Sequence, residues 1–149
     1  MLTAILLGPA LAHLFELPAK LPLPRDDYLH VQQIYRGWAL FAVPIVLNLA
    51  LVATLTVRSR RSRPAFSWSL AALGWLVVAQ MVFWIWTYPA NLATEQWTTL
   101  PDNWEALRLQ WELSHDAGAL LTLAAFFCIA NLAVQPIEQQ APDSTRIGT

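Results

Sequence analysis

Charged residues are scarce in this sequence. Only 13% of the 149 residues are Asp, Glu, Lys or Arg, while 56% are hydrophobic. A typical soluble domain has about 25% charged residues and roughly 45–50% apolar ones. A single domain of this length has no soluble core large enough for the excess of apolar side chains. The composition therefore excludes an ordinary soluble domain and favours an integral membrane protein surrounded by lipid.

Cysteine and surplus positive charge are also lacking. Cys128 is the one cysteine, so a disulfide within the chain and a cysteine metal cluster are both excluded. The net charge is -1, and no basic face is available to follow a phosphate backbone. Nucleic acid is therefore not a predicted partner, whereas an oligomer of this chain is compatible with the sequence.

What the sequence does contain is four long apolar segments. A lipid-exposed span must be helical, because its backbone groups find no water to bond. We therefore predict an all-α fold, an integral membrane antiparallel four-helix bundle in one domain over residues 1–134. Its spans are expected at about 2–17, 29–57, 66–88 and 104–134. The polar, proline-containing tail over 135–149 is expected to be disordered and cytoplasmic.

Prolines predict where these helices begin, bend and end. Pro18 is expected to end the first helix, and Pro89 to close the third. Pro44 is expected to kink the second helix. Pro101 marks the start of the fourth, which is predicted to begin well before its apolar run at Ala117.

Basic residues predict the orientation in the cell membrane. The connection between the second and third spans contains Arg58, Arg60, Arg61 and Arg63. The other connections are much less basic. The positive-inside rule therefore predicts that this arginine-rich connection and both termini are cytoplasmic.

Ionisable residues inside a membrane bundle are energetically costly, and here they concentrate in its predicted outward-facing half. Four of them form the predicted centre of a site: His13, Glu16, Glu112 and His115. Around them we expect a second set of polar side chains: His30, Gln33, Arg36, Gln80 and Arg108.

The spacing of the central four predicts their arrangement. His13 and Glu16 are three residues apart on the first helix, and Glu112 and His115 are three apart on the fourth, in reverse order. Residues three apart share a helix face. With the two helices antiparallel, the histidines should face each other at a deeper level and the glutamates at a shallower one.

Three interpretations of this cluster remain open. A single non-haem metal ion held by His13, Glu16, Glu112 and His115 would suit the ligand types. A metal-free acid–base or oxygen-handling pocket is the second interpretation. The third is structural, with His–Glu and Arg–Glu pairs joining helices. Haem is disfavoured, because nearby glutamates do not suit an apolar haem pocket.

Several short motifs resemble one family of small four-helix membrane proteins, the anthrone-oxygenase-like proteins, most of which are classed as a domain of unknown function. The chain looks like a bacterial branch of that group over about residues 8–134. The motifs that carry the resemblance are residues 13–18 (HLFELP), 32–38 (QQIYRGW) and 88–91 (YPAN), followed by Trp104, Arg108, Trp111 and His115.

The resemblance implies oxygenation of a polycyclic anthrone to an anthraquinone without metal or flavin, with a base such as His115 removing a proton. The chain has Asp116-Ala117-Gly118 where the family has a basic residue, which departs from the pattern. The leading prediction is a membrane-embedded oxidoreductase acting on a hydrophobic small molecule at an outward-facing His/Glu pocket. The alternative is a non-enzymatic membrane scaffold or accessory subunit whose buried polar residues only join helices.

Overall fold

The regular secondary structure of the described residues is helical throughout. The computed structural model describes residues 2–134, so the tail predicted to be disordered lies outside the described residues. The elements follow in the order α1 (Leu2–Lys20), α2 (Arg25–Gln32), η1 (Gln33–Tyr35), η2 (Trp38–Phe41), α3 (Ala42–Arg58), η3 (Ser59–Arg61), α4 (Arg63–Val82), η4 (Phe83–Thr87), α5 (Tyr88–Ala93) and α6 (Trp104–Ala133).

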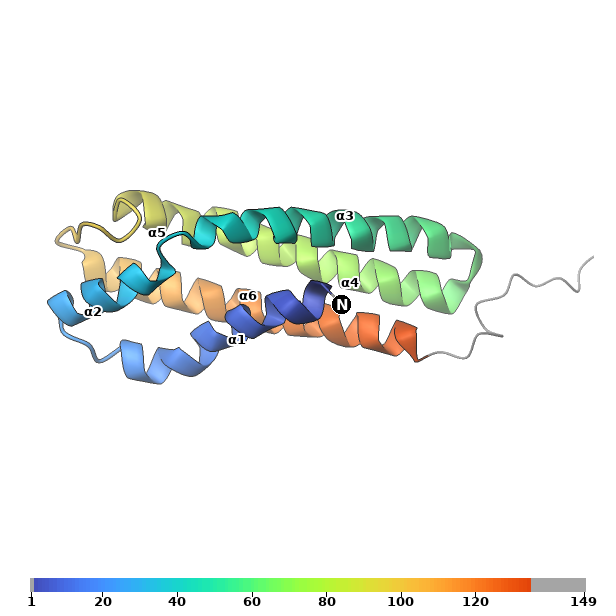
Figure 1. Cartoon of the computed structure of the whole chain (residues 1–149), viewed down its shortest axis with the longest axis horizontal. Coiled ribbons are helices and arrows are strands. Elements are labelled where there is room, and N and C mark those ends of the chain that lie inside the picture. The colour runs from blue at the N-terminus through green and yellow to red at the C-terminus, as the bar shows by residue number, and fades with distance from the viewer. Residues whose placement is uncertain (1, 135–149) are drawn as a thin grey trace, which may run out of the picture.

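Four long helices lie side by side, with α6 between α1 and α4, and with α3 packed on α4 (Figure 1). Four helical segments of the described chain are long and apolar enough to cross a membrane: Leu2–Lys20, Trp38–Arg61, Arg63–Ala93 and Trp104–Ala133. The prediction of four long apolar helices is therefore confirmed.

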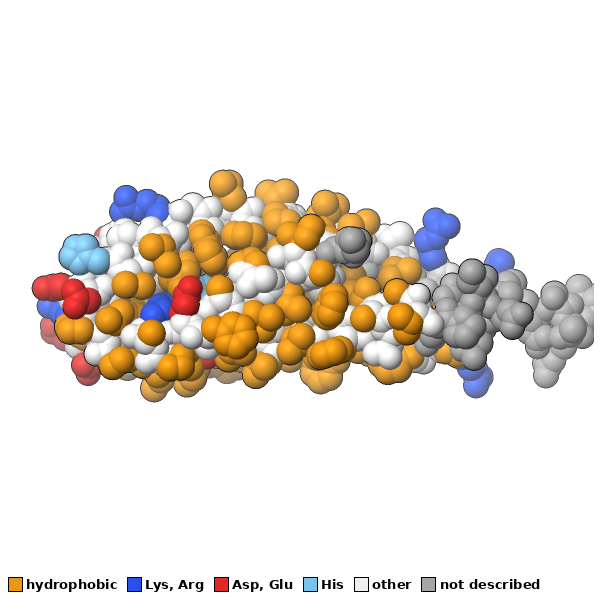
Figure 2. Space-filling model, turned by 60° about the horizontal axis from the view of Figure 1, so that its bottom comes forward, with side chains coloured by type: hydrophobic (Ala, Val, Ile, Leu, Met, Phe, Trp, Pro, Cys, Tyr) orange, Lys and Arg blue, Asp and Glu red, His pale blue; other side chains and the backbone are white. Residues whose placement is uncertain are grey.

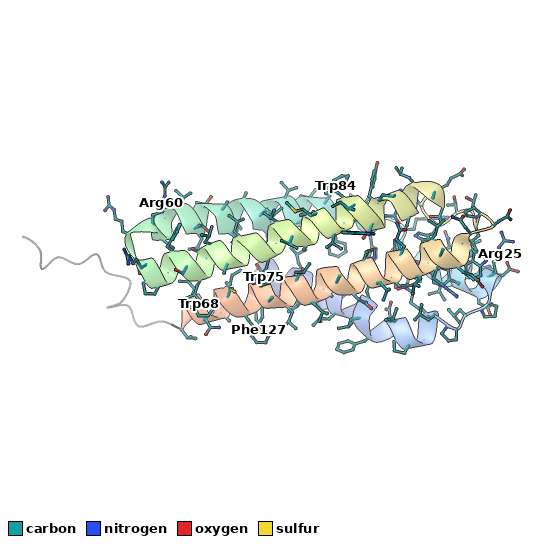
Figure 3. All side chains as sticks on the ribbon, turned by 180° about the vertical axis from the view of Figure 1, so that it is seen from behind. Arg25, Arg60, Trp68, Trp75, Trp84 and Phe127 are labelled. Atoms are coloured by element: carbon teal, nitrogen blue, oxygen red, sulfur yellow. The ribbon has the colours of Figure 1, made fainter. Side chains whose placement is uncertain are left out.

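Large apolar side chains cover much of the outer surface. Leu40, Phe15 and Val43 are 78%, 75% and 70% exposed. Figure 2 shows apolar side chains along the length of one face, with charged side chains mainly toward its two ends. Arg25 and Arg60 lie at opposite ends of the molecule (Figure 3). Such an outer surface would be unfavourable in water and suits a hydrocarbon environment.

The first helix is longer than predicted. α1 continues through Pro18 to Lys20, and the backbone N–H of Leu21 still donates to the carbonyl of Leu17 at 3.0 Å. Proline removes one N–H but its fixed φ is compatible with a helix. The extra turn positions the Lys20 side chain for a buried ion pair, described below, which compensates for the lost backbone bond.

The second helix is interrupted where continuity over 29–57 was predicted. Gly37 has a φ of +90°, in the left-handed region, and separates η1 from η2. A helix cannot continue through that conformation, and glycine adopts it without strain. Pro44, predicted to kink this helix, lies in the first turn of α3, where a missing N–H breaks no bond within that α-helix.

The third helix runs through the proline predicted to close it. Helix continues from Arg63 to Ala93, with a π-helical segment at Phe83–Thr87 that ends two residues before Pro89. A π-bulge changes the local hydrogen-bond pattern, so the missing N–H of Pro89 can be accommodated. Pro64 lies in the first turn of α4, where its missing N–H breaks no helical hydrogen bond.

The fourth helix agrees with the prediction. α6 spans 30 residues from Trp104 to Ala133 and therefore measures about 45 Å. It begins well before Ala117, and the N–H of Trp104 donates to the carbonyl of Pro101 at 3.0 Å. A helix of this length exceeds the roughly 30 Å hydrocarbon core of a bilayer.

Candidate functional site

Two histidines face each other between α1 and α6. The ring centroids of His13 and His115 are 4.4 Å apart, with 41° between the ring planes. His13 is only 3% exposed and also contacts the rings of Tyr35, Trp38 and Trp111 at centroid distances of 4.7, 5.3 and 5.2 Å. The prediction that the two histidines face each other across the first and fourth helices is therefore confirmed.

Hydrogen bonding differs between the two rings. His115 Nδ1 lies 2.9 Å from the carbonyl oxygen of Trp111. Because a carbonyl only accepts, His115 Nδ1 carries the proton in this bond. His13 Nδ1 is buried and has no hydrogen-bond partner among residues 2–134. The two rings thus contact each other at a tilt, without a hydrogen bond between them in the described chain.

A buried ion pair that the sequence did not predict lies beside the histidines. The Nζ of Lys20 lies 2.8 Å from Oε1 and 3.1 Å from Oε2 of Glu112. The Lys20 side chain is 4% exposed and that of Glu112 is 0% exposed. The ammonium also lies 4.7 Å from the ring centre of Tyr35 and 4.8 Å from that of Trp111. Aromatic faces attract a cation, so they add to the stabilisation by Glu112.

Two tyrosines extend this ion pair into a larger network. Tyr28 Oη donates to Glu112 Oε1 at 2.9 Å, and Gln32 Nε2 donates to Tyr28 Oη. Lys20 Nζ donates to Tyr35 Oη at 3.1 Å, and that hydroxyl donates to Glu16. We call these six residues the polar network: Glu16, Lys20, Tyr28, Gln32, Tyr35 and Glu112. It joins α1, the α2–η1 segment and α6.

The tyrosines stay protonated in this network. Burial, followed by the nearby Glu112 carboxylate, raises the pKa of Tyr28 far above its ordinary value. Burial and the hydrogen bond to Glu16 likewise raise the pKa of Tyr35. A neutral phenol is a hydrogen-bond donor, so the two hydroxyls donate to the fully buried carboxylate of Glu112 and to the half-buried one of Glu16.

The glutamates do not form the simple facing layer that was predicted. Glu16 and Glu112 are linked through Lys20 and Tyr35 instead. Among residues 2–134, no three His, Cys, Asp or Glu side chains lie close enough to hold a metal ion together. The Lys20 ammonium pairs with Glu112 and is connected to Glu16 through the Tyr35 hydroxyl. The structure thus does not assemble the four-residue metal site that the sequence suggested.

The second set of predicted residues is only partly near this network. Arg108 is close to it: its Nη1 donates to the carbonyl of Leu23 at 2.9 Å, and its guanidinium lies 5.3 Å from the ring centre of Tyr28. Gln33 Nε2 donates to the carbonyl of Trp97 at 2.7 Å.

The other three predicted residues lie outside the network. Arg36 donates to the Oε1 of Gln33 at 2.7 Å, and His30 Nδ1 donates to the carbonyl of Asp26 at 2.7 Å. Both contacts are exposed at the surface. Gln80 is half-buried on α4, which packs on the other side of α6 from α1.

Further buried polar contacts hold α6 to its other neighbours. Asn91 Oδ1 accepts from the indole N–H of Trp111 at 2.7 Å and from that of Trp97 at 3.2 Å. The hydroxyls of Thr87 and Ser114 lie 2.7 Å apart between the π-helical segment and α6. Each buried donor in these pairs finds an acceptor, which removes the penalty of burying it unpaired.

Two hollows of the described chain lie away from His13 and His115. One, of about 280 Å³, is lined by Leu29, His30, Gln33, Arg36 and Thr98. The other, of about 490 Å³, lies at the arginine-rich turn between α3 and α4. Neither is lined by His13, Glu16, Glu112 or His115. An outward-facing pocket at the His/Glu cluster therefore stays a prediction.

Comparison of the chain with models of protein families, with curated protein sequences and with solved structures found no match. The resemblance to the anthrone-oxygenase-like proteins therefore stays a prediction from the short sequence motifs.

Proposed function

We propose that this chain is a multi-pass membrane protein whose four long helices cross the bilayer as an antiparallel bundle. Support comes from the four apolar helices and from their exposed apolar side chains. It also comes from the path of the chain in Figure 1, where α3 and α4 lie alongside each other and are joined by the short turn over residues 59–62. Flotation of the purified protein with phospholipid vesicles tests this proposal, and a chain that stays with the soluble fraction would overturn it.

The proposed orientation has the arginine-rich turn and both termini in the cytoplasm, because arginines concentrate at that turn. Single cysteines test it in a background where the buried Cys128 is replaced by alanine. Asp27→Cys is expected to react with a membrane-impermeant thiol reagent in intact cells, whereas Arg60→Cys should react only after permeabilisation. Strong labelling of Arg60→Cys from outside would reverse the orientation.

For the His/Glu cluster, the geometry best supports a structural role, in a membrane scaffold or accessory subunit without catalytic activity. The observation that carries this proposal is the Lys20–Glu112 pair, in which a fully buried carboxylate is saturated by an ammonium and a tyrosine hydroxyl. A catalytic carboxylate must reach a substrate, but Glu112 has no exposed surface. Its contacts instead fix the packing of α1 against α6.

The second candidate function is an oxidoreductase. It is supported by two buried polar atoms outside the Lys20–Glu112 pair. His13 Nδ1 and Asp116 Oδ1 are both buried without a hydrogen-bond partner in the described chain. His115 is half-buried, so one side of this histidine pair is not sealed. Unpaired buried polar atoms are unusual and can mark a functional position. A small hydrophobic molecule beside His115 could use such atoms for orientation or proton transfer.

An oxygen-uptake assay separates the two candidates. An anthrone reacts with one O₂ to give the anthraquinone and one water, so oxygen consumption reports the reaction directly. With a structural role, reconstituted protein and its His115→Ala variant should consume oxygen equally, at the rate of protein-free vesicles. Faster uptake with the unaltered chain that the His115→Ala variant loses, while its thermal unfolding is unchanged, would favour the oxidoreductase instead.

A further inference from the structure

A large hollow lies at the end of the molecule opposite the polar network. Its volume is about 490 Å³, and it is formed where α3 ends, α4 begins and α6 ends. None of the described residues that line it comes from α1, which starts partway along the bundle in Figure 1. The lining residues are Leu55, Arg58, Ser59, Arg61, Ser62, Ala65, Ile129, Leu132 and Ala133.

The rim of this hollow is basic. Arg58 and Arg61 line it, and no Asp or Glu is among the described residues that do so. The hollow also adjoins the first turn of α4, a helix of 20 residues that begins at Arg63. The N-terminal end of such a helix carries a partial positive charge. An anion at the rim would therefore meet two guanidinium groups and a favourable helix dipole.

Apart from Ser59 and Ser62, the remaining lining of the same hollow is apolar. Leu55 comes from α3, Ala65 from α4, and Ile129 and Leu132 from α6. These side chains offer no hydrogen-bond partner to a fully polar ligand such as free phosphate. A ligand that contacts the whole hollow must combine an anionic group with a hydrocarbon part.

We propose that this hollow binds one anionic phospholipid, with its phosphate on Arg58 and Arg61 and the start of an acyl chain on the apolar surface. Arginine suits phosphate because its planar guanidinium donates two parallel hydrogen bonds. Basic pockets between membrane helices on the cytoplasmic side are a recurrent way to bind lipid headgroups. The inference rests on the proposed membrane insertion, because a phospholipid reaches the hollow from the bilayer.

Two neighbouring arginines provide a matched control. Arg60 and Arg63 belong to the same turn and carry the same charge, but they do not line the hollow. Arg60 Nε instead donates to the carbonyl of Val57 at 3.1 Å. A site-specific interaction should depend on Arg58 and Arg61, whereas diffuse attraction to a charged surface should depend on all four equally.

The test uses the full chain in nanodiscs of phosphatidylcholine with a minor share of phosphatidylglycerol, followed by native mass spectrometry of retained lipid. The unaltered chain should retain phosphatidylglycerol, and the Arg58→Gln/Arg61→Gln variant should bind it more weakly by at least about tenfold, since losing one hydrogen bond to a charged group has about that effect. The Arg60→Gln/Arg63→Gln variant should retain it. Added inorganic phosphate should not displace the lipid.

Each other outcome has a distinct meaning. Equal loss in both double variants, or no preference for phosphatidylglycerol over phosphatidylcholine, would overturn the site. Displacement by inorganic phosphate would indicate a free-anion site and would also overturn it. All variants must incorporate into nanodiscs as the unaltered chain does. If the unaltered chain itself fails to incorporate, the proposed membrane insertion fails instead.

Discussion

Replacing Lys20 by methionine should strongly destabilise the protein. The change removes the ammonium that lies 2.8 Å from Oε1 of Glu112 but keeps an unbranched side chain of similar length. Glu112 is 0% exposed, so its charge would lose its counter-ion without gaining water. Breaking a buried pair from one side typically costs about 3–5 kcal/mol. The remaining hydrogen bond from Tyr28 should keep the loss toward the lower end of that range.

The measurement is equilibrium unfolding in mixed detergent micelles, followed by tryptophan fluorescence, because Trp111 lies beside the Lys20 ammonium. Arg36→Met is the matched control: it also removes a cation, but from an exposed side chain whose guanidinium donates to Gln33. Exposed charges contribute little, so that variant should change the free energy of unfolding by less than about 1 kcal/mol.

The double variant Lys20→Met/Glu112→Met tests whether the pair is the cause. Removing both charges leaves no uncompensated ion, so the double variant should be more stable than the sum of the single effects predicts. A coupling free energy of about 2–3 kcal/mol is expected for groups in direct contact. If Lys20→Met costs no more than Arg36→Met, or if the two single effects simply add, the account of Lys20 as the counter-ion of Glu112 is wrong.

Two further predictions concern other parts of the bundle, and unfolding in the same micelles measures both. Gly37→Ala should lower the free energy of unfolding by about 1–2 kcal/mol, because Gly37 has a φ of +90°. The control, Gly74→Ala in α4, should be neutral or stabilising, because an added Cβ there meets nothing within 4 Å. Equal effects of the two substitutions would exclude backbone strain at Gly37. Thr3→Val should cost about 1–3 kcal/mol, because it leaves the buried Oδ1 of Asn48 without the hydroxyl that donates to it at 2.8 Å. Thr54→Val is the control, since its exposed hydroxyl bonds only within its own helix, and an equal loss there would contradict the importance of the α1–α3 contact.

The sequence alone was enough to predict the all-helical fold and the four apolar helices. Hydrocarbon length and the need to satisfy backbone groups leave few alternatives for apolar segments of about 20 residues. The same reasoning predicted that His13 and His115 face each other, because residues three apart share a face and polar groups avoid lipid. These rules act within one helix or against the surrounding solvent, so they need no knowledge of the tertiary structure.

Some helix details depended on local geometry that proline and glycine leave open. Pro18 and Pro89 were predicted to end helices, yet both lie within helix in the structure. A proline removes one hydrogen bond, and the surroundings decide whether the helix ends or tolerates the loss. At Pro89 a π-helical segment accommodates it, and after Pro18 the extra turn is held by Lys20. Glycine is compatible with a helix as well as with a left-handed conformation that ends one, and Gly37 adopts the left-handed conformation here.

The partners within the candidate site were decided only by the tertiary structure. Lys20 lies on the same helix face as His13 and Glu16, because it follows His13 by seven residues. That spacing could have predicted Lys20 as a member of the site. Its partner Glu112, however, is 92 residues away, and Tyr28 reaches the same carboxylate from 84 residues away. Ion pairs and tyrosine hydrogen bonds have no preferred sequence separation, because they depend on which helices become neighbours. Only the packing of α1 and α2 against α6 determines that the cation beside these glutamates is a lysine.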